Sequence, residues 1–259
     1  MTKIAASILS ADFADLAADC QRLLNQGTDL LHFDVMDGHF VPNISFGAPV
    51  LECLHKALPE VFYDVHLMIS NPVKYAPDFA KAGANLITFH LESNSDPEAV
   101  IEKLREAAPD IAIRTSLIAG FPGETQEEHE ALMAFLDEQE LDRVGVFTYS
   151  REDGTPAATF ENQIDEETAE QWRNEIMELQ QEISLDKNET FVGKIMQVII
   201  EGYSSDDDVY VGRTYRDAPG VDGLVNCDYE LMSGQIVDVR INEVGPYDMI
   251  GGIVDESAE

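Results

Sequence analysis

The sequence predicts an α/β protein in which a partial barrel of six parallel strands is followed by a small all-β barrel. Three observations lead to this prediction. Six short β-rich runs alternate with helix-patterned stretches over the first two-thirds of the 259 residues. The runs are almost continuously apolar, which is typical of parallel strands covered on both faces. After residue 193 the helix signals stop, and short strands separated by turn residues replace them.

The alternating part consists of repeated βα units, for which right-handed connections are expected. The six β-rich runs cover residues 4–8, 30–35, 62–68, 86–90, 111–119 and 143–148. The helix patterns cover residues 12–25, 49–57, 73–82, 97–107 and 125–138, and a long polar helix is expected over residues 166–190. Six strands fall short of the eight in a TIM barrel, so we expect a TIM-like (β/α)6 barrel that stays half open.

The last part of the chain has the pattern of a small antiparallel barrel. Its expected strands cover residues 195–201, 209–213, 223–225, 235–242 and 248–254. The acidic stretch 204–208 falls between two of these strands and is expected to be a loop. A barrel of this kind closes on roughly 60 residues without needing helices in its core.

Composition and charge narrow the possible functions. Fifty acidic residues against sixteen basic ones give a formal net charge of −34, so direct DNA binding through phosphate contacts is not expected. The acidity fits either an ordinary solvated surface or a basic protein partner. No run reaches the ~18 apolar residues of a membrane span. The first residues also lack the apolar core of a signal peptide, so we expect a cytoplasmic protein with no membrane contact.

The three cysteines, Cys20, Cys53 and Cys227, lie far apart in the sequence. No pair has the short spacing of a zinc knuckle or of an iron–sulfur site. We therefore expect free thiols in a reducing compartment and no iron–sulfur cluster.

Polar residues fall where the first three strands end. Ser7 ends the first strand, His32 and Asp34 share one face of the second, and His66 lies near the end of the third. In a parallel barrel the carboxyl ends of the strands carry the chemistry. Two imidazoles and one carboxylate at this mouth could hold a divalent zinc, iron or manganese ion. The alternative is a set of ordinary hydrogen-bonded polar residues at the barrel rim.

Long motifs in this region resemble those of the ribulose-phosphate 3-epimerase family. They are ASILSADF at 6–13, HFDVMDGHFVPN at 32–43 and DVHLM at 64–68, and the resemblance continues through AKAGA at 80–84 and ITFH at 87–90. Together they cover residues 3–92. The resemblance implies a TIM-barrel enzyme that inverts the carbon next to the ketone of ribulose 5-phosphate, which makes that sugar phosphate the candidate substrate.

The resemblance also assigns roles to residues. It makes His32, Asp34 and His66 metal ligands, with Asp34 doubling as a catalytic acid/base, and it places Ser7 and His66 in contact with the substrate. A bound divalent ion stabilises an enediolate, while carboxylates on opposite faces move the proton.

The resemblance further implies that Met36 and Met68 line the metal pocket, although from the residues alone they could equally be core methionines. The sequence departs from the family in its second half. The family pattern there has an Asp-Gly-Gly run, which carries the opposing aspartate and fourth ligand, and an Asn-Pro-Gly-Phe-Gly-Gly phosphate loop. Neither occurs in this sequence. We therefore expect an incomplete and impaired isomerase site.

A second resemblance covers residues 96–254. IRTSLIAGFPGET at 113–125, DRVGVFTYS at 142–150 and MELQQEIS at 177–184 resemble the late barrel of the radical-SAM methylthiotransferases that modify a ribosomal-protein aspartate. YVGRTYRDAP at 210–219 and DGLV at 222–225 resemble the C-terminal, OB-like TRAM domain of that family. The CxxxCxxC loop of the family does not occur, so no radical chemistry is expected. Residues 120–124 border the S-adenosylmethionine pocket in that family; from the residues alone they form a strand-to-helix turn.

The sequence thus predicts a chimera of three parts. An epimerase-like half barrel with the first four strands covers residues 1–92, a barrel tail with two strands and the long helix covers 93–190, and the TRAM-like barrel covers 191–259. One functional hypothesis is a partly retained metal-dependent isomerase. The other is a TRAM module that binds a basic ribosomal protein or RNA. A chimera without activity is the third interpretation, and packing at the junction, residues 92–112, is the main structural risk.

Overall fold

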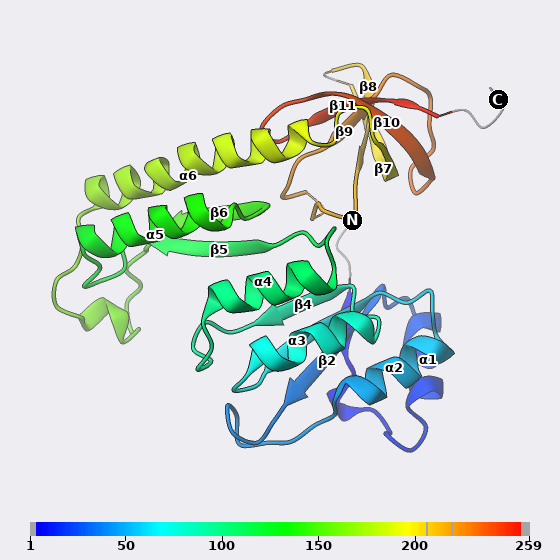
Figure 1. The fold of residues 1–259 in the computed structure, drawn as a ribbon, viewed down its shortest axis with the longest axis horizontal. Helices are drawn as coiled ribbons and strands as arrows, with labels where there is room; N and C mark the ends of the chain where they lie inside the picture. Colours follow the sequence, from blue (N-terminus) through cyan, green and yellow to red (C-terminus); the bar gives the residue numbers. More distant parts are fainter. Residues whose placement is uncertain (1–3, 206, 219, 255–259) are drawn as a thin grey trace. The chain divides into compact units, whose positions relative to one another are not determined.

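The computed structural model describes residues 4–205, 207–218 and 220–254. The chain divides into two compact units, Met1–Ile111 and Ala112–Glu259, which are considered separately below (Figure 1). Among the described residues, no helix is both long enough and apolar enough to cross a membrane.

The first unit is built on one parallel sheet of four strands in the order β1-β2-β3-β4. The strands are β1 (Ala5–Ser7), β2 (Leu30–Met36), β3 (Tyr63–Met68) and β4 (Leu86–Phe89). The connecting helices are η1 (Ile8–Ser10), α1 (Leu16–Asn25), α2 (Ala48–Ala57) and α3 (Pro72–Lys81), and α4 (Pro97–Ala107) follows β4. This is the start of a TIM-like barrel, as the sequence predicts.

The two faces of this sheet differ in burial. On one face Leu31, Phe33 and Val65 are fully buried in the core that the helices cover. The other face alternates with it and carries polar side chains that are only half buried. The near-continuous apolar runs led us to expect cover on both faces. Within this unit the helices cover one face, and the other face carries the candidate site residues.

Helix α4 belongs to the first unit. Its side chains Val100 and Leu104 pack into the same core as Phe33, and α4 contacts α3. The fold boundary at residues 111 and 112 therefore lies downstream of the seam that the sequence resemblances place at residues 92 and 93. The boundary between the two units is defined by packing, whereas the seam is defined by where one sequence resemblance gives way to the other. The position of the seam therefore stays a prediction.

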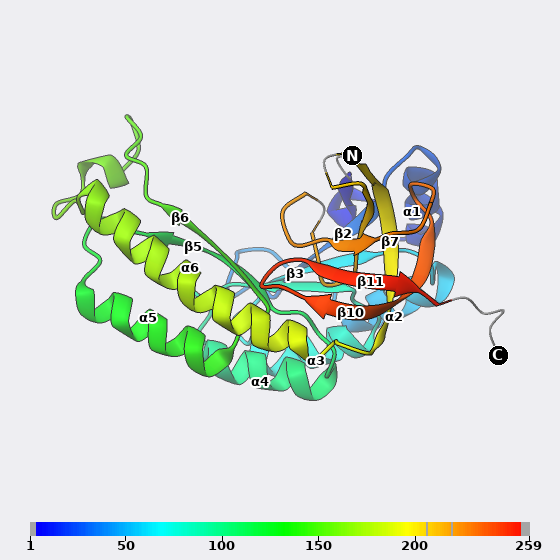
Figure 2. The same cartoon turned by 90° about the horizontal axis from the view of Figure 1, so that it is seen from above.

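The second unit begins with a two-stranded parallel sheet of β5 (Arg114–Ala119) and β6 (Arg143–Thr148). Helices α5 (Gln126–Gln139) and α6 (Glu166–Glu189) run alongside these strands (Figures 1 and 2), and a short η2 (Ala157–Thr159) lies between β6 and α6. Thr125 and Glu128 form a capping box at the start of α5, and Asp165 caps α6. These side chains accept hydrogen bonds from amides that would otherwise lack a partner.

The chain ends in a closed barrel of five strands in the order β10-β11-β9-β8-β7. Its strands are β7 (Ile195–Ser204), β8 (Val209–Arg213), β9 (Val225–Cys227), β10 (Ile236–Val244) and β11 (Met249–Ile253). Val198, Val239 and Ile241 are fully buried in its core. All the pairs are antiparallel as predicted except β9 with β11, which run parallel. Of the predicted acidic loop, Ser204 ends β7, and Asp206 lies outside the described residues.

All six predicted strands of the alternating part are present. The first four form the parallel sheet of the first unit, and the last two form the parallel sheet of the second unit. The predicted parallel α/β start and the closed β-barrel are therefore confirmed.

Candidate metal centre

Strand register brings the predicted ligands together. β2 and β3 are parallel neighbours in which Asp34 lies opposite His66, and β1 places Ser7 opposite His32. His32 and Asp34 are two residues apart on one strand and therefore share a face. The half-buried face of the sheet thus collects all four side chains at the carboxyl ends of three strands.

The geometry is that of a ligand set around one point. His32 Nε2 lies 3.0 Å and His66 Nδ1 lies 3.1 Å from the same oxygen, Asp34 Oδ1. One ligand atom from each of the three residues lies within 4.8 Å of the others, and each residue is half buried. A tetrahedral ion with bonds of about 2.1 Å holds its ligands about 3.4 Å apart. These residues therefore fit a divalent ion with only small shifts.

Two further contacts orient the ligands. The hydroxyl of Ser7 donates to Asp34 Oδ2 at 2.7 Å, which leaves Oδ1 directed toward the histidines. Asp64 Oδ2 lies 2.7 Å from His32 Nδ1. A carboxylate on one ring nitrogen fixes the tautomer and presents the other nitrogen to a metal. His32 Nε2 is thus positioned as a ligand atom.

The charges at this site are mutually stabilising. Burial alone would lower the pKa of His32, but the hydrogen bond and charge of Asp64, together with Asp34, outweigh it and raise that pKa above its ordinary value. Burial would likewise raise the pKa of Asp34, yet the hydrogen bond from Ser7 and the two histidines bring it below its ordinary value. The nearby carboxylates therefore favour the protonated form of His32, and a bound cation would compete with that proton.

Sequence reasoning missed the roles of Asp64 and His90. His90 follows β4, and its Nε2 lies 2.7 Å from His66 Nε2, while its ring also contacts Phe40. Both residues fall inside the resembled motifs. The available signal was their spacing, because Asp64 lies two residues before His66 on β3 and His90 lies two residues after Thr88 of β4. Met36 and Met68 lie opposite one another at the ends of β2 and β3, and both are half buried.

The turn after β2 is held in place by Asp37. Its carboxylate accepts hydrogen bonds from the backbone N–H groups of His39, Phe40 and Ser70. Burial opposes ionisation, but these bonds lower the pKa of Asp37 far below its ordinary value. Asp37 therefore ties the β2 loop to the end of β3 and fixes the rim beside the metal ligands.

In the second unit, residues 120–124 form the predicted strand-to-helix turn. Glu124 Oε2 accepts the backbone N–H groups of Gly120 at 2.6 Å and Phe121 at 3.1 Å. Gly120 has a φ of 77°, and a Cβ there would lie 2.4 Å from Ala169. The glycine is therefore required by the backbone conformation and by close packing against α6. An open hollow of about 460 Å³, lined by Ile118 and Phe121 among others, borders this turn.

The three cysteines are free. Cys20 is buried in the core of the first unit and Cys227 in that of the closed barrel, whereas Cys53 is exposed. Burial raises the pKa of both the Cys20 and the Cys227 thiols, which makes them less reactive. The metal-type group among the described residues is the His32–Asp34–His66 set, which contains no cysteine.

Different segments of the chain match different known proteins. Residues 3–117 match the ribulose-phosphate 3 epimerase family. Residues 192–254 match the TRAM domain. A ribosomal protein uS12 methylthiotransferase of Lachnoclostridium phytofermentans is 47% identical over 161 residues, which are 61% of this chain and 37% of that protein. The corresponding protein of Roseiflexus sp. is 46% identical over 174 residues, 66% of this chain and 37% of its own length.

The chain spans a little over a third of the length of these curated relatives. Among solved structures, active domain 2 of a thermostable chitinase from Pyrococcus furiosus has a TM-score of 0.36 and 15% identity, with 63% of this chain and 65% of that chain covered. That likeness is too small to guide an interpretation. The sequence matches instead make the chain a chimera, in which an epimerase-family segment at residues 3–117 precedes a methylthiotransferase-like segment that ends in a TRAM domain at residues 192–254.

Proposed function

We propose that the first unit binds a divalent zinc, iron or manganese ion through His32, Asp34 and His66, and forms an incomplete epimerase-type site for ribulose 5-phosphate. The observation that carries this proposal is the convergence of His32 Nε2 and His66 Nδ1 on a single oxygen of Asp34. Imidazole and carboxylate donors suit these three metals. The match of residues 3–117 to the epimerase family supports the substrate class.

The residues present account for half of the proton chemistry. A divalent ion in this site would supply Lewis-acid stabilisation to the oxygens of a ketose. Asp34, ionised and held by Ser7, would take the proton from the carbon next to the ketone on one face. Inversion needs a second acid on the opposite face. The Asp-Gly-Gly run that carries it in the family pattern does not occur in this sequence, so we expect impaired epimerisation.

The test is the metal content of the purified chain, measured together with ribulose 5-phosphate turnover. We expect about one divalent ion per chain, and loss of that ion in His66→Ala. His39→Ala is the matched control, because His39 is an exposed imidazole on the neighbouring loop, hydrogen-bonded within its own turn. Wild-type protein that binds no zinc, iron or manganese would refute the site. Turnover at the rate of a two-base epimerase would refute the impairment.

A second proposal concerns the TRAM domain, which we infer to bind a basic polypeptide. The observation that favours this is how its few basic side chains are used. Arg213 is paired with Glu201 and Arg216 with Asp142, Lys194 lies over the ring of Phe191, and Arg240 donates to the carbonyl of Gly193. Little positive charge remains for phosphates, which disfavours RNA. The curated relatives are named for acting on ribosomal protein uS12.

Fluorescence anisotropy with the full chain separates these two partners. The probes are a labelled lysine- and arginine-rich peptide and an RNA oligonucleotide of equal length. We expect the peptide to bind, and its affinity to fall as salt rises, because the attraction is between exposed charges. Tighter binding of the RNA would overturn the proposal. Failure of both probes, with metal-free and inactive protein, would leave the interpretation of a chimera without activity.

A further inference from the structure

Two buried arginine–aspartate pairs link the TRAM barrel to the β5–β6 part of the same unit. Asp217, in the loop after β8, accepts hydrogen bonds from Arg143 Nε at 3.2 Å and from Arg143 Nη2 at 2.6 Å. In the opposite direction Arg216 donates to Asp142. Each side of this contact, called the joint below, thus supplies one acidic and one basic residue that are neighbours in the sequence. All four residues are buried.

Most of the remaining polar atoms of this set have a partner, whereas Arg216 Nε is buried without one. Asp142 also accepts the backbone N–H of Ile113 at 2.9 Å and lies 3.5 Å from Lys187 Nζ of α6. Asp217 Oδ2 accepts the hydroxyl of Thr214 at 2.6 Å. Buried ion pairs hold two surfaces together only when such additional bonds satisfy their other donors and acceptors. The Arg216 guanidinium also lies 4.8 Å from the centre of the Phe191 ring, which adds a cation–π contact.

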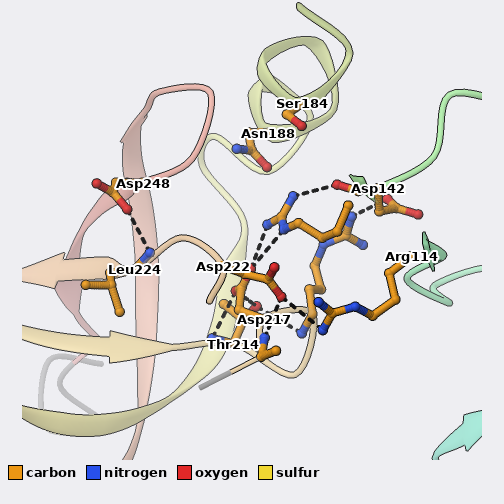
Figure 3. A network of polar contacts seen from close by, with 12 residues as sticks. Arg114, Asp142, Ser184, Asn188, Thr214, Asp217, Asp222, Leu224 and Asp248 are labelled. Carbon is orange, nitrogen blue, oxygen red and sulfur yellow. Dashed lines mark hydrogen bonds and ion pairs between the residues drawn. The ribbon is translucent and has the colours of Figure 1, made fainter. Parts of the chain in front are cut away.

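Two further contacts widen the joint, and Figure 3 shows the first of them, between Arg114 and Asp222. Arg114 of β5 reaches Asp222 at 3.3 Å, and Asn188 of α6 donates to the carbonyl of Gly245 at 2.9 Å. The barrel is therefore held from β5, from the start of β6 and from the end of α6. A single covalent connection, the turn after α6, would by itself leave the barrel free to swing.

We propose that the Arg143–Asp217 and Arg216–Asp142 pairs act as a clamp that fixes the TRAM barrel on the β5–β6 sheet, so that residues 112–254 move as one body. Arg143 and Arg216 are positioning residues in this proposal. The clamp places any partner of the barrel at a fixed distance from the β5–β6 sheet. The inference rests on these contacts alone and stands whether or not the barrel binds a polypeptide.

Limited trypsin digestion of the full chain tests the clamp, because Lys187 and Lys194 flank the turn between α6 and β7. We expect Arg216→Met to speed cleavage at these two lysines at least tenfold. Arg213→Met is the matched control, since Arg213 is paired at 2.8 Å with Glu201 inside the barrel and does not cross the joint. It should leave the cleavage rate near that of the wild type.

Asp217→Asn provides an independent variant if Arg216→Met does not fold, because it removes only the charge of one acceptor. The clamp is refuted if Arg216→Met and Asp217→Asn are cleaved as slowly as Arg213→Met.

Discussion

The His32–Asp34–His66 cluster of the first unit and the clamp of the second unit are both sets of opposite charges. They differ in how deeply the side chains are buried and in how the charges are paired. The side chains of Asp34 and His66 are 13% and 22% exposed, whereas those of Arg216 and Asp142 are 5% and 6% exposed. In the first set, His32 Nε2 and His66 Nδ1 both lie close to one oxygen, Asp34 Oδ1. In the second set, each charge is directed at a partner of opposite sign.

That difference distinguishes the proposed metal site from the proposed clamp. The contacts within a set of candidate metal ligands contribute little to the stability of the fold. The larger free energy comes from binding the ion. A buried pair with its hydrogen bonds made contributes to the fold, and removal of one partner leaves an uncompensated charge. Substitutions in the two sets should therefore change different measured quantities.

The largest expected effect is on stability in the second unit. Asp217→Ala leaves Arg143 buried without its acceptor, and we expect the free energy of unfolding to fall by about 3–5 kcal/mol. Urea unfolding followed by tryptophan fluorescence measures this, because the single tryptophan, Trp172, is buried in α6 of this unit. Glu201→Ala, which removes a partly exposed acceptor, should cost about 1 kcal/mol or less. Equal losses in the two variants would remove the distinction between buried and exposed pairs.

The next effect is on metal affinity in the first unit. Asp64→Asn should weaken binding of the ion about 10- to 100-fold, because the carboxylate that orients His32 is lost while all three ligands stay. Titration with zinc against a chromogenic chelator measures it, and the unfolding free energy of the metal-free protein should change little. Asp78→Asn, an exposed carboxylate on α3, is the control. An unchanged affinity in Asp64→Asn would show that His32 is not oriented through Asp64.

The His32–Asp34–His66 cluster could be predicted from the sequence because its geometry is local. Alternation places His32 and Asp34 on one face, and parallel neighbours bring His66 beside them. Helices with clear start signals were equally predictable, and α4 begins and ends at the predicted residues 97 and 107. The motif around Asp64 and His90 was visible, but their contacts depend on side-chain directions that spacing alone does not give.

The clamp and the parallel β9–β11 pair could not be predicted in this way. Arg143 and Asp217 are 74 residues apart, and in a chain with fifty acidic residues Asp217 resembles any surface carboxylate. Strand signals identify which residues extend, yet they do not say which edges will pair. The parallel pairing of β9 with β11 inside the barrel, where antiparallel pairs were expected, is such a case.

The pH dependence of the unfolding free energy tests whether Asp142 of the clamp is ionised in the folded protein. Burial raises the pKa of Asp142, but the N–H of Ile113 and the charges of Arg216 and Lys187 outweigh it, so its pKa lies below the ordinary value of 3.8. A carboxyl with a lowered pKa contributes stability that is present above pH 3.8 and lost as the pH falls through its folded-state pKa. We expect the difference in unfolding free energy between wild type and Asp142→Asn to narrow below about pH 4. A difference that stays constant as the pH falls would contradict the ionised pair.

The smallest expected effect is the loss of stability when the cap at the start of α5 is removed. Thr125→Ala removes the side chain that accepts the Glu128 N–H at the start of α5, and exposed caps of this kind contribute about 1 kcal/mol. Trp172 reports the loss in the same urea experiment, because it stacks on His129 of α5. Thr125→Ser keeps the hydroxyl and should retain most of the stability. The cap and the clamp lie in one unit, so the loss of unfolding free energy in Thr125→Ala can be compared directly with the loss in Asp217→Ala. The ratio of the two losses measures what burial adds to a hydrogen-bonded polar contact. Equal losses would mean that burial adds nothing.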